Sequence, residues 1–585
     1  MTNKLLTRWV LAMLFSISAG TLAADDNDQL NRQMADYWAA YLDASPLVAA
    51  AYGAPGPRDK VDDLSPEARA ATRARLDAHI EQLQAIEPGK LTRANREHYE
   101  AFEWMLRNER ALLDHNSRYF SFNTFGGWHT YFPQIVLSLP YRSEQDYRDL
   151  LKRLGEFNRF AQQNIDLLRE GIDAGYTQPC ETLAGYEASI SGFIAEDPQK
   201  SLFAIPFAAM PESIAAETRT ELQAEAMAVI AGSINLGYAA YAKFFEQEYL
   251  PACREQVGLS SLPGGRAAYD QLLRYYISLD TDADTVHALG LSEVARIRKD
   301  MQAVIDEVEF DGDFADFLEF LRTDPQFYAT DEQSYLNQVA WVAKSIDGKL
   351  PGFFARLPSN PYGIMPVPAQ TAPKTATAYY QPGASDGTRA GQYFVNTYKL
   401  DNRPLYELPA LSLHEGVPGH HLQFSFQGEN TAMPDWRRSY YFHAYGEGWG
   451  LYSEYLGIEM GMYNTPYERF GRMIYEMWRA VRLVVDTGMH AKGWTRQQAI
   501  DYMLANTGLA EQNVVSEVDR YITYPGQATS YKHGELKIRE LRKRAEKALG
   551  AEFDLRQFHV EVLEGGSLPL SVLEAKIDRW IASQE

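Results

Sequence analysis

The sequence predicts a mostly α-helical protein that carries one small β-hairpin. Apolar residues recur at three- and four-residue steps through long stretches, whereas strand-like alternation is confined to short segments. The chain has 585 residues, of which 45% are hydrophobic and 23% are charged. This composition is ordinary for a folded globular protein, so we expect a large helical body around a substantial core.

Three segments show the helical pattern most clearly. After Ser143, a typical capping residue, the apolar positions between Tyr147 and Leu168 follow helical spacing. The run Leu64–Glu67 has the composition of a helix start, with proline at the first helical position. Apolar positions between Phe470 and Val485 mark the third helix.

The predicted hairpin consists of Ala376–Gln381 and Gln392–Thr397, which alternate as strands do. The turn-rich run Pro382–Gly387 separates them and favours a reversal of the chain.

A proline-rich stretch from Leu357 to Pro373 holds five prolines, which should interrupt any regular element. We place a boundary there. The sequence thus predicts a helical N-terminal part over 24–370 and a C-terminal part over 371–585, packed together as one body.

The N-terminus predicts a signal peptide over residues 1–23. Lys4 and Arg8 precede the apolar run Trp9–Ala19, and small residues follow as far as Ala24. The apolar run is shorter than the roughly 20 residues that span a bilayer. No cysteine follows it to carry a lipid. We therefore expect a periplasmic or secreted protein without a stable membrane anchor once the leader is cleaved after Ala23 or Ala24.

The charge balance argues against a nucleic-acid partner. The chain has 56 basic and 78 acidic residues, which gives a net charge of −22. Such a charge repels phosphate backbones, and we find no basic patch in the sequence to offset it.

The sequence contains two cysteines, Cys180 and Cys253. In an exported protein such a pair favours one disulfide, and two buried free thiols are the alternative. Neither cysteine has the spacing of a metal or redox site.

Four of the 12 histidines fall within 30 residues: His414, His420, His421 and His443. The zinc-peptidase pattern HExxH places two imidazoles one helical turn apart on one ion, with the glutamate facing water. Here His420 lies six residues after His414, which in an unbroken helix is a rise of about 9 Å. Pro418 and Gly419 lie between them and would let the helix bulge, so that both imidazoles could reach one metal.

The segments HEGVPGHHLQ, AYGEGWGLYSE and YPGQATSYKHGELKI resemble the domain-of-unknown-function 885 family, which is bacterial, largely helical and similar to glutamate-zincin metallopeptidases. The resemblance to this family covers nearly the whole mature chain. Similarity to characterised peptidases, such as angiotensin-converting enzyme and Taq-type carboxypeptidases, rests on the motif and its Gly-His ending. Together these resemblances imply a glutamate-zincin-like fold, with a small sheet beside the metal-binding helix.

Carried over residue by residue, the resemblance implies a zinc peptidase that acts on a peptide substrate. His414, His420 and Glu447 would be the metal ligands, with Glu447 on the next helix, and Glu415 would be the catalytic base. His421 stays open as an alternative to His420.

Glu454 shares a helix face with Glu447, and either could be the ligand. We choose Glu447 because Gly446 and Gly448 on either side of it would allow close packing against the metal helix. Glu454 is then a supporting or surface carboxylate.

Peptide hydrolysis also needs a hydrogen-bond donor for the developing oxyanion. Tyr531 is the first candidate and His443 the second. The resemblance further implies that the strand Gly391–Thr397 pairs with the substrate backbone. Asp486 and His490 are spaced to interact, and we expect them to form a surface pair.

Two other functions compete with the peptidase. Gly383–Gly387 fits the GxSxG pattern of serine hydrolases, but Pro382 directly before it and the strand after it do not fit that motif. A non-catalytic periplasmic binding protein or chaperone with structural zinc is the second alternative. Exopeptidase, dipeptidase and oligopeptidase activity all stay open, as does the oligomeric state.

Overall fold

The computed structural model of the protein describes residues 25–124, 126–369, 372–384 and 387–584. The predicted signal peptide and its cleavage site lie outside these residues. Among the described helices, none combines the length and the apolar character that crossing a bilayer requires.

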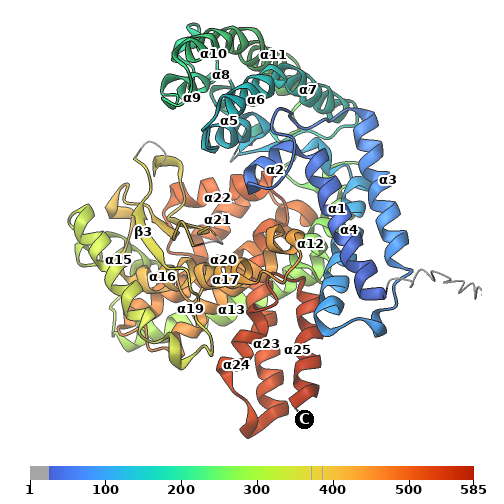
Figure 1. The fold of residues 1–585 in the computed structure, drawn as a ribbon. Coiled ribbons are helices and arrows are strands. Elements are labelled where there is room, and N and C mark those ends of the chain that lie inside the picture. The colour runs from blue at the N-terminus through green and yellow to red at the C-terminus, as the bar shows by residue number, and fades with distance from the viewer. Residues whose placement is uncertain (1–24, 125, 370–371, 385–386, 585) are drawn as a thin grey trace, which may run out of the picture.

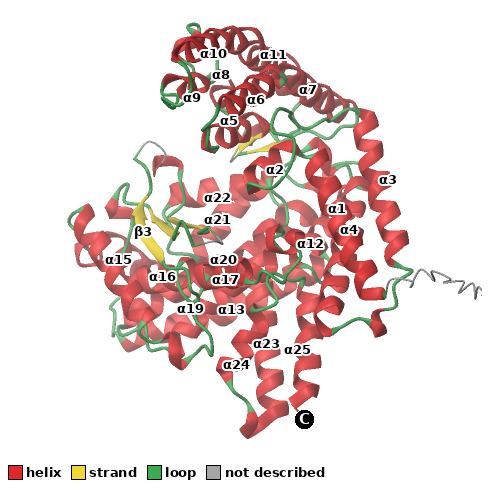
Figure 2. Cartoon of the chain, viewed as in Figure 1, coloured by secondary structure: helices red, strands yellow, loops and turns green. Residues whose placement is uncertain are grey.

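Helices dominate the fold, as predicted (Figure 2). In the first half of the chain they are α1 (Asp26–Ala44), α2 (Pro46–Tyr52), α3 (Pro66–Leu83), α4 (Arg93–Asp114), α5 (Trp128–Ser138), α6 (Glu144–Gly155), α7 (Phe157–Asp173), α8 (Glu187–Ser191), α9 (Ile205–Ala208), α10 (Ala216–Val229), α11 (Asn235–Phe244), α12 (Gly265–Ile277) and α13 (Ala283–Glu307). In the second half they are α14 (Phe314–Thr323), α15 (Glu332–Asp347), α16 (Leu408–Glu415), α17 (His420–Glu429), α18 (Asp435–Ser439), α19 (His443–Glu459), α20 (Pro466–Lys492), α21 (Arg496–Asn506), α22 (Glu511–Thr523), α23 (Ser530–Leu549), α24 (Leu555–Leu563) and α25 (Leu570–Gln584).

The three helices predicted from periodicity all form, but one of them is divided. Ser65 caps α3 by accepting from the Ala68 N–H, and α20 covers the third predicted segment. The Tyr147–Leu168 segment forms both α6 and α7, because the Ser233 hydroxyl sits at their junction. That hydroxyl accepts from the Asn158 N–H and donates to the Gly155 carbonyl, in place of continuous helical bonding.

A three-stranded sheet contains the predicted hairpin. Strands β4 (Ala378–Gln381) and β5 (Gly391–Val395) pair antiparallel, which confirms it. A third strand, β3 (Tyr362–Pro366), pairs parallel to β5, so the order is β3-β5-β4. A separate two-stranded ribbon joins β1 (Phe122–Asn123) to β2 (Gly126–Gly127).

The expectation that prolines would exclude regular structure between Leu357 and Pro373 was wrong. Pro361 precedes β3 and Pro366 ends it. Because β3 lies at the edge of the sheet, a missing N–H on its outer side removes no ladder bond.

Apolar residues gather in two large clusters. One lies within residues 47–249 and holds α5–α11 together as the lobe at the top of Figure 1. The other runs from Leu30 to Ile581, so that α1, α3 and α4 share a core with α13–α25. The N-terminal helices therefore pack directly against the body that carries the candidate site. The division into two parts at residue 370 stays a prediction.

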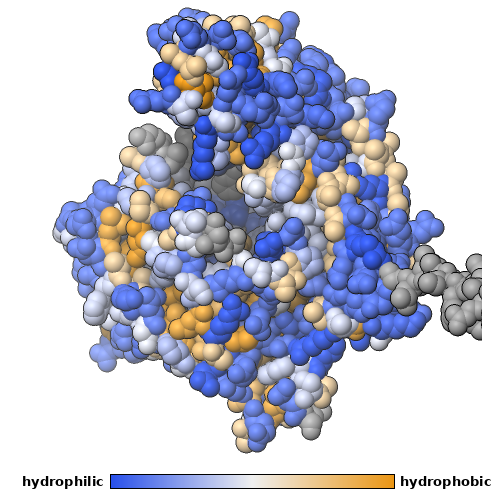
Figure 3. Space-filling view, in the orientation of Figure 1, coloured by the Kyte–Doolittle hydropathy of each residue, from blue (hydrophilic) through white to orange (hydrophobic). Residues whose placement is uncertain are grey.

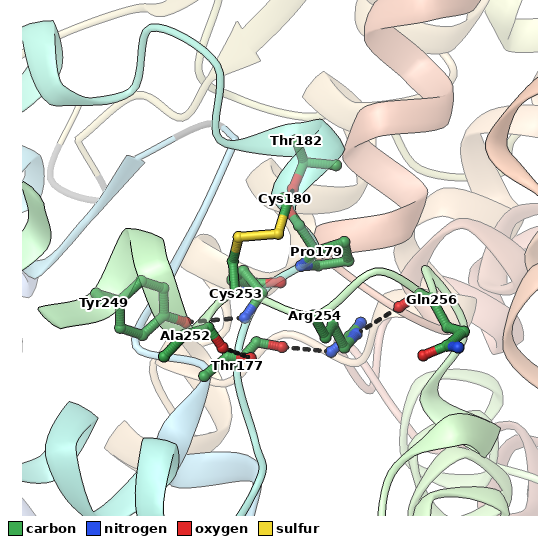
Figure 4. Close-up of a disulfide and its surroundings, with 10 residues drawn as sticks. Thr177, Pro179, Cys180, Thr182, Tyr249, Ala252, Cys253, Arg254 and Gln256 are labelled. Carbon is green, nitrogen blue, oxygen red and sulfur yellow. Dashed lines mark hydrogen bonds between the residues drawn. A yellow bond between two sulfur atoms is a disulfide. The ribbon is translucent and has the colours of Figure 1, made fainter.

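Cys180 and Cys253 form a disulfide, which confirms the first alternative (Figure 4). The two Cα atoms are 5.1 Å apart although 73 positions separate them in sequence. The Cys180 N–H donates to the Arg254 carbonyl at 2.9 Å, so backbone pairing supports the crosslink. The bond fastens the segment after α7 to the segment after α11.

Candidate metal centre

The histidine motif lies on two helices rather than on one bulged helix. Helix α16 ends at Glu415 and α17 begins at His420, with the cis peptide Val417–Pro418 in the connection. A Cβ atom at Gly419 would lie 1.9 Å from the His414 carbonyl oxygen, so only glycine allows this close return of the chain. The motif has two residues more than HExxH between its histidines, and a complete break between the helices accommodates them, so that His420 begins the second helix.

The break brings the three predicted ligands together. Glu447 Oε2, from α19, lies 3.7 Å from His414 Nε2 and 3.6 Å from His420 Nε2. One potential ligand atom from each of the three residues falls within 4.8 Å of the others. Both histidines are buried and Glu447 is half-buried. Ligand atoms about 2.0–2.2 Å from one zinc ion would be separated by roughly these distances.

Glu454 holds His414 in the orientation that such a site requires. Its Oε1 accepts from His414 Nδ1 at 2.8 Å, and Arg479 Nη2 lies 3.7 Å from the same oxygen. The Glu454 side chain is only 1% exposed, which excludes a surface role. With Nδ1 engaged, Nε2 of His414 faces Glu447, as in the carboxylate–histidine pairs that orient metal ligands.

The electrostatics of the cluster favour a positive charge. Burial opposes protonation of His414, but its bonds to Glu447 and Glu454 outweigh this and raise its pKa to about 9. Burial also disfavours the charged form of Glu447, yet the bonds from His414 and His420 hold its pKa well below the usual range. Two imidazoles and a carboxylate in such a setting are donors that fit a zinc ion.

Glycines on α19 allow neighbouring segments to pack closely against this helix. The glycine that contacts the metal helix, however, is not one of the two that the sequence predicted. A Cβ at Gly446 would meet the Tyr441 hydroxyl at 2.2 Å, and one at Gly448 would meet Gly534 of α23 at 2.4 Å. The glycine that faces the metal helix is Gly450, where a Cβ would lie 2.7 Å from the His414 ring. Gly450 comes one helical turn after Gly446, and it lies on the face of α19 that contacts the His414 ring.

His421 points away from the cluster. Its Nδ1 is 2.9 Å from the Tyr380 hydroxyl, and its ring packs on that of Tyr362 at 4.7 Å between centroids. Burial lowers the pKa of His421 to about 4, so the ring is neutral and bonded within the protein. Of the two alternatives, the geometry favours His420 as the ligand.

Glu415 is the last residue of α16 and directly follows His414. Its side chain is half-buried, and no described residue hydrogen-bonds to its carboxylate. Burial raises the pKa of Tyr393 and of Tyr441 well above the usual range, and the nearby Glu415 carboxylate raises both further.

Tyr531 lies in the first turn of α23, with the Arg482 guanidinium 4.5 Å from the centre of its ring. It is close enough to Tyr441 to affect the pKa of that phenol, which burial raises well above its usual range. Sequence reasoning missed Tyr441, whose hydroxyl donates to Glu447 Oε1 at 3.2 Å. Nothing in the spacing of the chain marks this residue.

His443, the second oxyanion candidate, is the first residue of α19. Its ring meets Tyr441 edge-on at 5.3 Å, and its buried Nδ1 makes no hydrogen bond within the described part of the chain. It lies near the cluster without joining it.

Two further expectations were wrong. The segment Gly391–Thr397, expected to pair with a substrate, forms the central strand β5 over Gly391–Val395, and β3 and β4 already occupy both of its edges. Asp486 and His490 are fully buried rather than at the surface. Asp486 accepts from the Gly526 N–H at 3.0 Å, and His490 Nε2 lies 2.9 Å from the Tyr521 carbonyl oxygen, so each serves the packing of α20.

The GxSxG pattern lies in the connection between two antiparallel strands, β4 and β5. Its Ser385 and Asp386 fall outside the described residues. A nucleophile elbow instead joins a strand to a helix.

The fold and the site define a mostly helical protein with a buried cluster of two histidines and one glutamate. The chain belongs to the family described as bacterial protein of unknown function (DUF885), which it matches over residues 46–577. A comparison with curated proteins gave no match.

Solved structures share this fold. A candidate lipoprotein from Colwellia psychrerythraea aligns with a TM-score of 0.88 and 28% identity, over 96% of this chain and 100% of that one. A candidate lipoprotein of unknown function from Shewanella oneidensis aligns with a TM-score of 0.73 and 18% identity, over 94% and 99%. A carboxypeptidase from Pyrococcus furiosus aligns over 96% and 99%, but its TM-score of 0.31 and 10% identity are too low to support a common fold.

Proposed function

We propose that the protein is an exported zinc-dependent peptidase. The observation that carries this proposal is the convergence of His414, His420 and Glu447 within 4.8 Å, next to the unpaired carboxylate of Glu415. When bound, zinc would act as a Lewis acid toward water and a substrate carbonyl.

Glu415 performs the proton transfers. Its carboxylate takes a proton from the water whose oxygen attacks the carbonyl carbon of the peptide bond. It then gives that proton to the departing amine nitrogen as the C–N bond breaks. Tyr531 donates a hydrogen bond to the carbonyl oxygen as negative charge develops there. Its closeness to Tyr441, which itself contacts Glu447, supports this role.

Short extended peptides are the proposed substrates. A cleft of about 780 Å³ extends from Tyr441 to Tyr380 and Gln381 of β4. Figure 3 shows the surface hollowed between the α5–α11 lobe and the body below it. The Asn396 N–H donates to the Thr377 carbonyl, so Thr377 directs its backbone polar groups toward β5. This direction alternates along an antiparallel strand, and Tyr380, three residues after Thr377, therefore directs its N–H and C=O to the free edge of β4. The strand available to pair with a peptide is thus β4, in place of the β5 segment expected from the sequence.

Export is supported by the leader-like composition of residues 1–23 and by the disulfide, which suits an oxidising compartment. The two solved relatives are described as candidate lipoproteins, a class of envelope proteins. We place the mature protein in the periplasm or outside the cell.

The test compares two substitutions at the centre. Glu415→Gln should keep about one zinc per chain but lower peptide hydrolysis by about 100-fold or more, because it removes the proton acceptor. His414→Ala should lose zinc, because one of three ligands is gone. Metal analysis and digestion of a mixed peptide pool measure both effects.

Glu459→Gln is the matched control, because Glu459 lies on α19 but pairs with Arg542 at the surface. Full zinc occupancy in His414→Ala would exclude the proposed centre. Zinc retention with equally slow turnover in wild type and Glu415→Gln would instead favour the binding-protein alternative.

A further inference from the structure

Three aromatic rings form a continuous stack along one wall of the cleft. The centroids of Tyr380 and Phe424 are 6.0 Å apart with planes inclined by 23°, and those of Phe424 and Tyr441 are 5.7 Å apart at 13°. All three side chains line the cleft. We refer to Tyr380, Phe424 and Tyr441 as the aromatic ladder.

The ladder connects the candidate metal centre to the free edge of the sheet. At its inner end the Tyr441 hydroxyl donates to Glu447, and the Phe424 ring lies 6.0 Å from the His420 ring. At its outer end Tyr380 belongs to β4 and bonds to His421. A peptide that pairs with β4 would therefore extend along the ladder toward the centre.

The dimensions of the ladder match a short run of peptide. Its two spacings, 6.0 and 5.7 Å, together equal roughly three residues of an extended chain at ~3.3 Å each. Side chains on one face of such a peptide would contact the rings.

The rings are not required by the core of the protein. None of the three belongs to the apolar clusters formed by the described residues. All three are half-buried, and each keeps part of its surface toward the cleft. Aromatic surface in this position is available to a ligand.

The chemistry of the cleft favours apolar side chains. Trp38 of α1 and Tyr52 of α2, with centroids 6.2 Å apart, add aromatic surface to its lining. Among the charged groups in the same lining, Arg438 pairs with Asp435 and Glu429 with Arg356, whereas Arg389 is exposed and its charge acts on Tyr380 at the outer end of the ladder. Arg389 would pair with an acidic group beside Tyr380, whereas a charged substrate side chain over Phe424 would lose water without gaining an ionic partner.

We propose that the aromatic ladder determines specificity, by selecting peptides with an aromatic or large aliphatic side chain at one position, or at two alternate positions, on one side of the scissile bond. This inference rests on the proposed peptidase function. Because Phe424 lies at the centre of the stack, we expect its ring to contribute most to this selectivity.

The experiment uses two fluorogenic peptides that differ only in having phenylalanine or alanine beside the scissile bond. Phe424→Ala should lower kcat/KM for the phenylalanine peptide about tenfold more than for the alanine peptide. This ratio corresponds to about 1.4 kcal/mol, which lies within the range that an aromatic pair contributes beyond buried area. Phe424→Leu, which keeps most of the volume, serves if Phe424→Ala fails to fold, and it should shift the ratio in the same direction.

Phe394→Ala is the matched control. Phe394 stacks on Tyr379 at 4.7 Å, on the opposite face of the sheet from Tyr380, so the same change there should leave the ratio unaltered. An equal fall for both peptides in Phe424→Ala would overturn the proposal, since it would show a structural role alone.

Binding separates this inference from the proposed function. Calorimetry on Glu415→Gln should show tighter binding of the phenylalanine peptide than of the alanine peptide. If the wild type binds the phenylalanine peptide selectively but hydrolyses neither peptide, the proposed peptidase activity is refuted and the proposed role of the aromatic ladder stands. If the wild type hydrolyses both peptides without preference for phenylalanine, the proposed role of the aromatic ladder is refuted and the proposed peptidase activity stands.

Discussion

At the residue scale, the candidate centre depends on which nitrogen of each histidine is free. Glu454 engages Nδ1 of His414 and leaves Nε2 for a ligand role. Tyr380 engages Nδ1 of His421, whose ring packs among aromatic residues instead. Two histidines of the same motif thus receive opposite tasks from their hydrogen-bond partners, which the motif alone cannot assign.

The register of the motif can be tested by single substitutions. His420→Ala should abolish zinc binding, because it removes one of three ligands, whereas His421→Ala should keep the metal. The second change removes the side chain that hydrogen-bonds to the Tyr380 hydroxyl and should cost about 1–2 kcal/mol of stability. Zinc content and urea unfolding measure the two effects. Loss of zinc from His421→Ala alone would move the second ligand by one position.

At the element scale, glycine positions fix how closely the helices approach. Gly419 permits the return of the chain between α16 and α17, and Gly448 meets Gly534 where α19 crosses α23. Gly450 lets α19 lie against the His414 ring. Helix propensity disfavours Gly448, Gly450 and Gly534 by about 1 kcal/mol each, so their presence within helices reflects contacts with neighbouring elements.

Gly450→Ala should weaken zinc binding without unfolding the protein. Its Cβ would lie 2.7 Å from the His414 ring, which must shift from its bond to Glu454. We expect a loss of affinity of about 10- to 100-fold, as for other changes that disturb ligand orientation. Competition with a chelator measures it.

The control is Gly155→Ala at the end of α6, where an added Cβ meets nothing within 4 Å. That variant should bind zinc as the wild type does. Equal affinities for all three proteins would show that the packing of Gly450 does not position His414.

At the scale of the whole molecule, distant parts of the chain build one cleft. Trp38 and Tyr52 come from the first two helices, whereas the aromatic ladder comes from residues 380–441. They meet because α1 packs in the same apolar cluster as the C-terminal helices. The disulfide lies elsewhere, against the cluster that holds the α5–α11 lobe together.

Removing the disulfide should therefore affect stability more than the metal centre. A closed loop with a separation of 73 residues contributes up to about 4 kcal/mol in the chain-entropy view. We expect the double substitution Cys180→Ser and Cys253→Ser to lower the thermal unfolding midpoint while zinc content stays the same. An unfolding midpoint that reductant does not change in the wild type would contradict this.

The sequence by itself determined the helical class, the β4–β5 hairpin and the pairing of the cysteines as one of two alternatives. It also led to the proposed ligands His414, His420 and Glu447, with His421 open as an alternative to His420. These follow from local information: periods of 3.6 and 2 residues, turn residues, and a motif whose members lie within 34 positions of one another. Helix starts such as Ser65 are equally local, because the cap bonds a residue three positions away.

Only the tertiary structure decided the rest. It placed β3 beside β5, which made β4 the free edge, and it gave Glu454, Tyr441 and His421 their partners. The physical reason is that hydrogen-bond partners and cleft walls depend on which surfaces are buried together. Residues such as Trp38 and Phe424 line one cleft although hundreds of positions separate them, and no spacing in the chain reports such a contact.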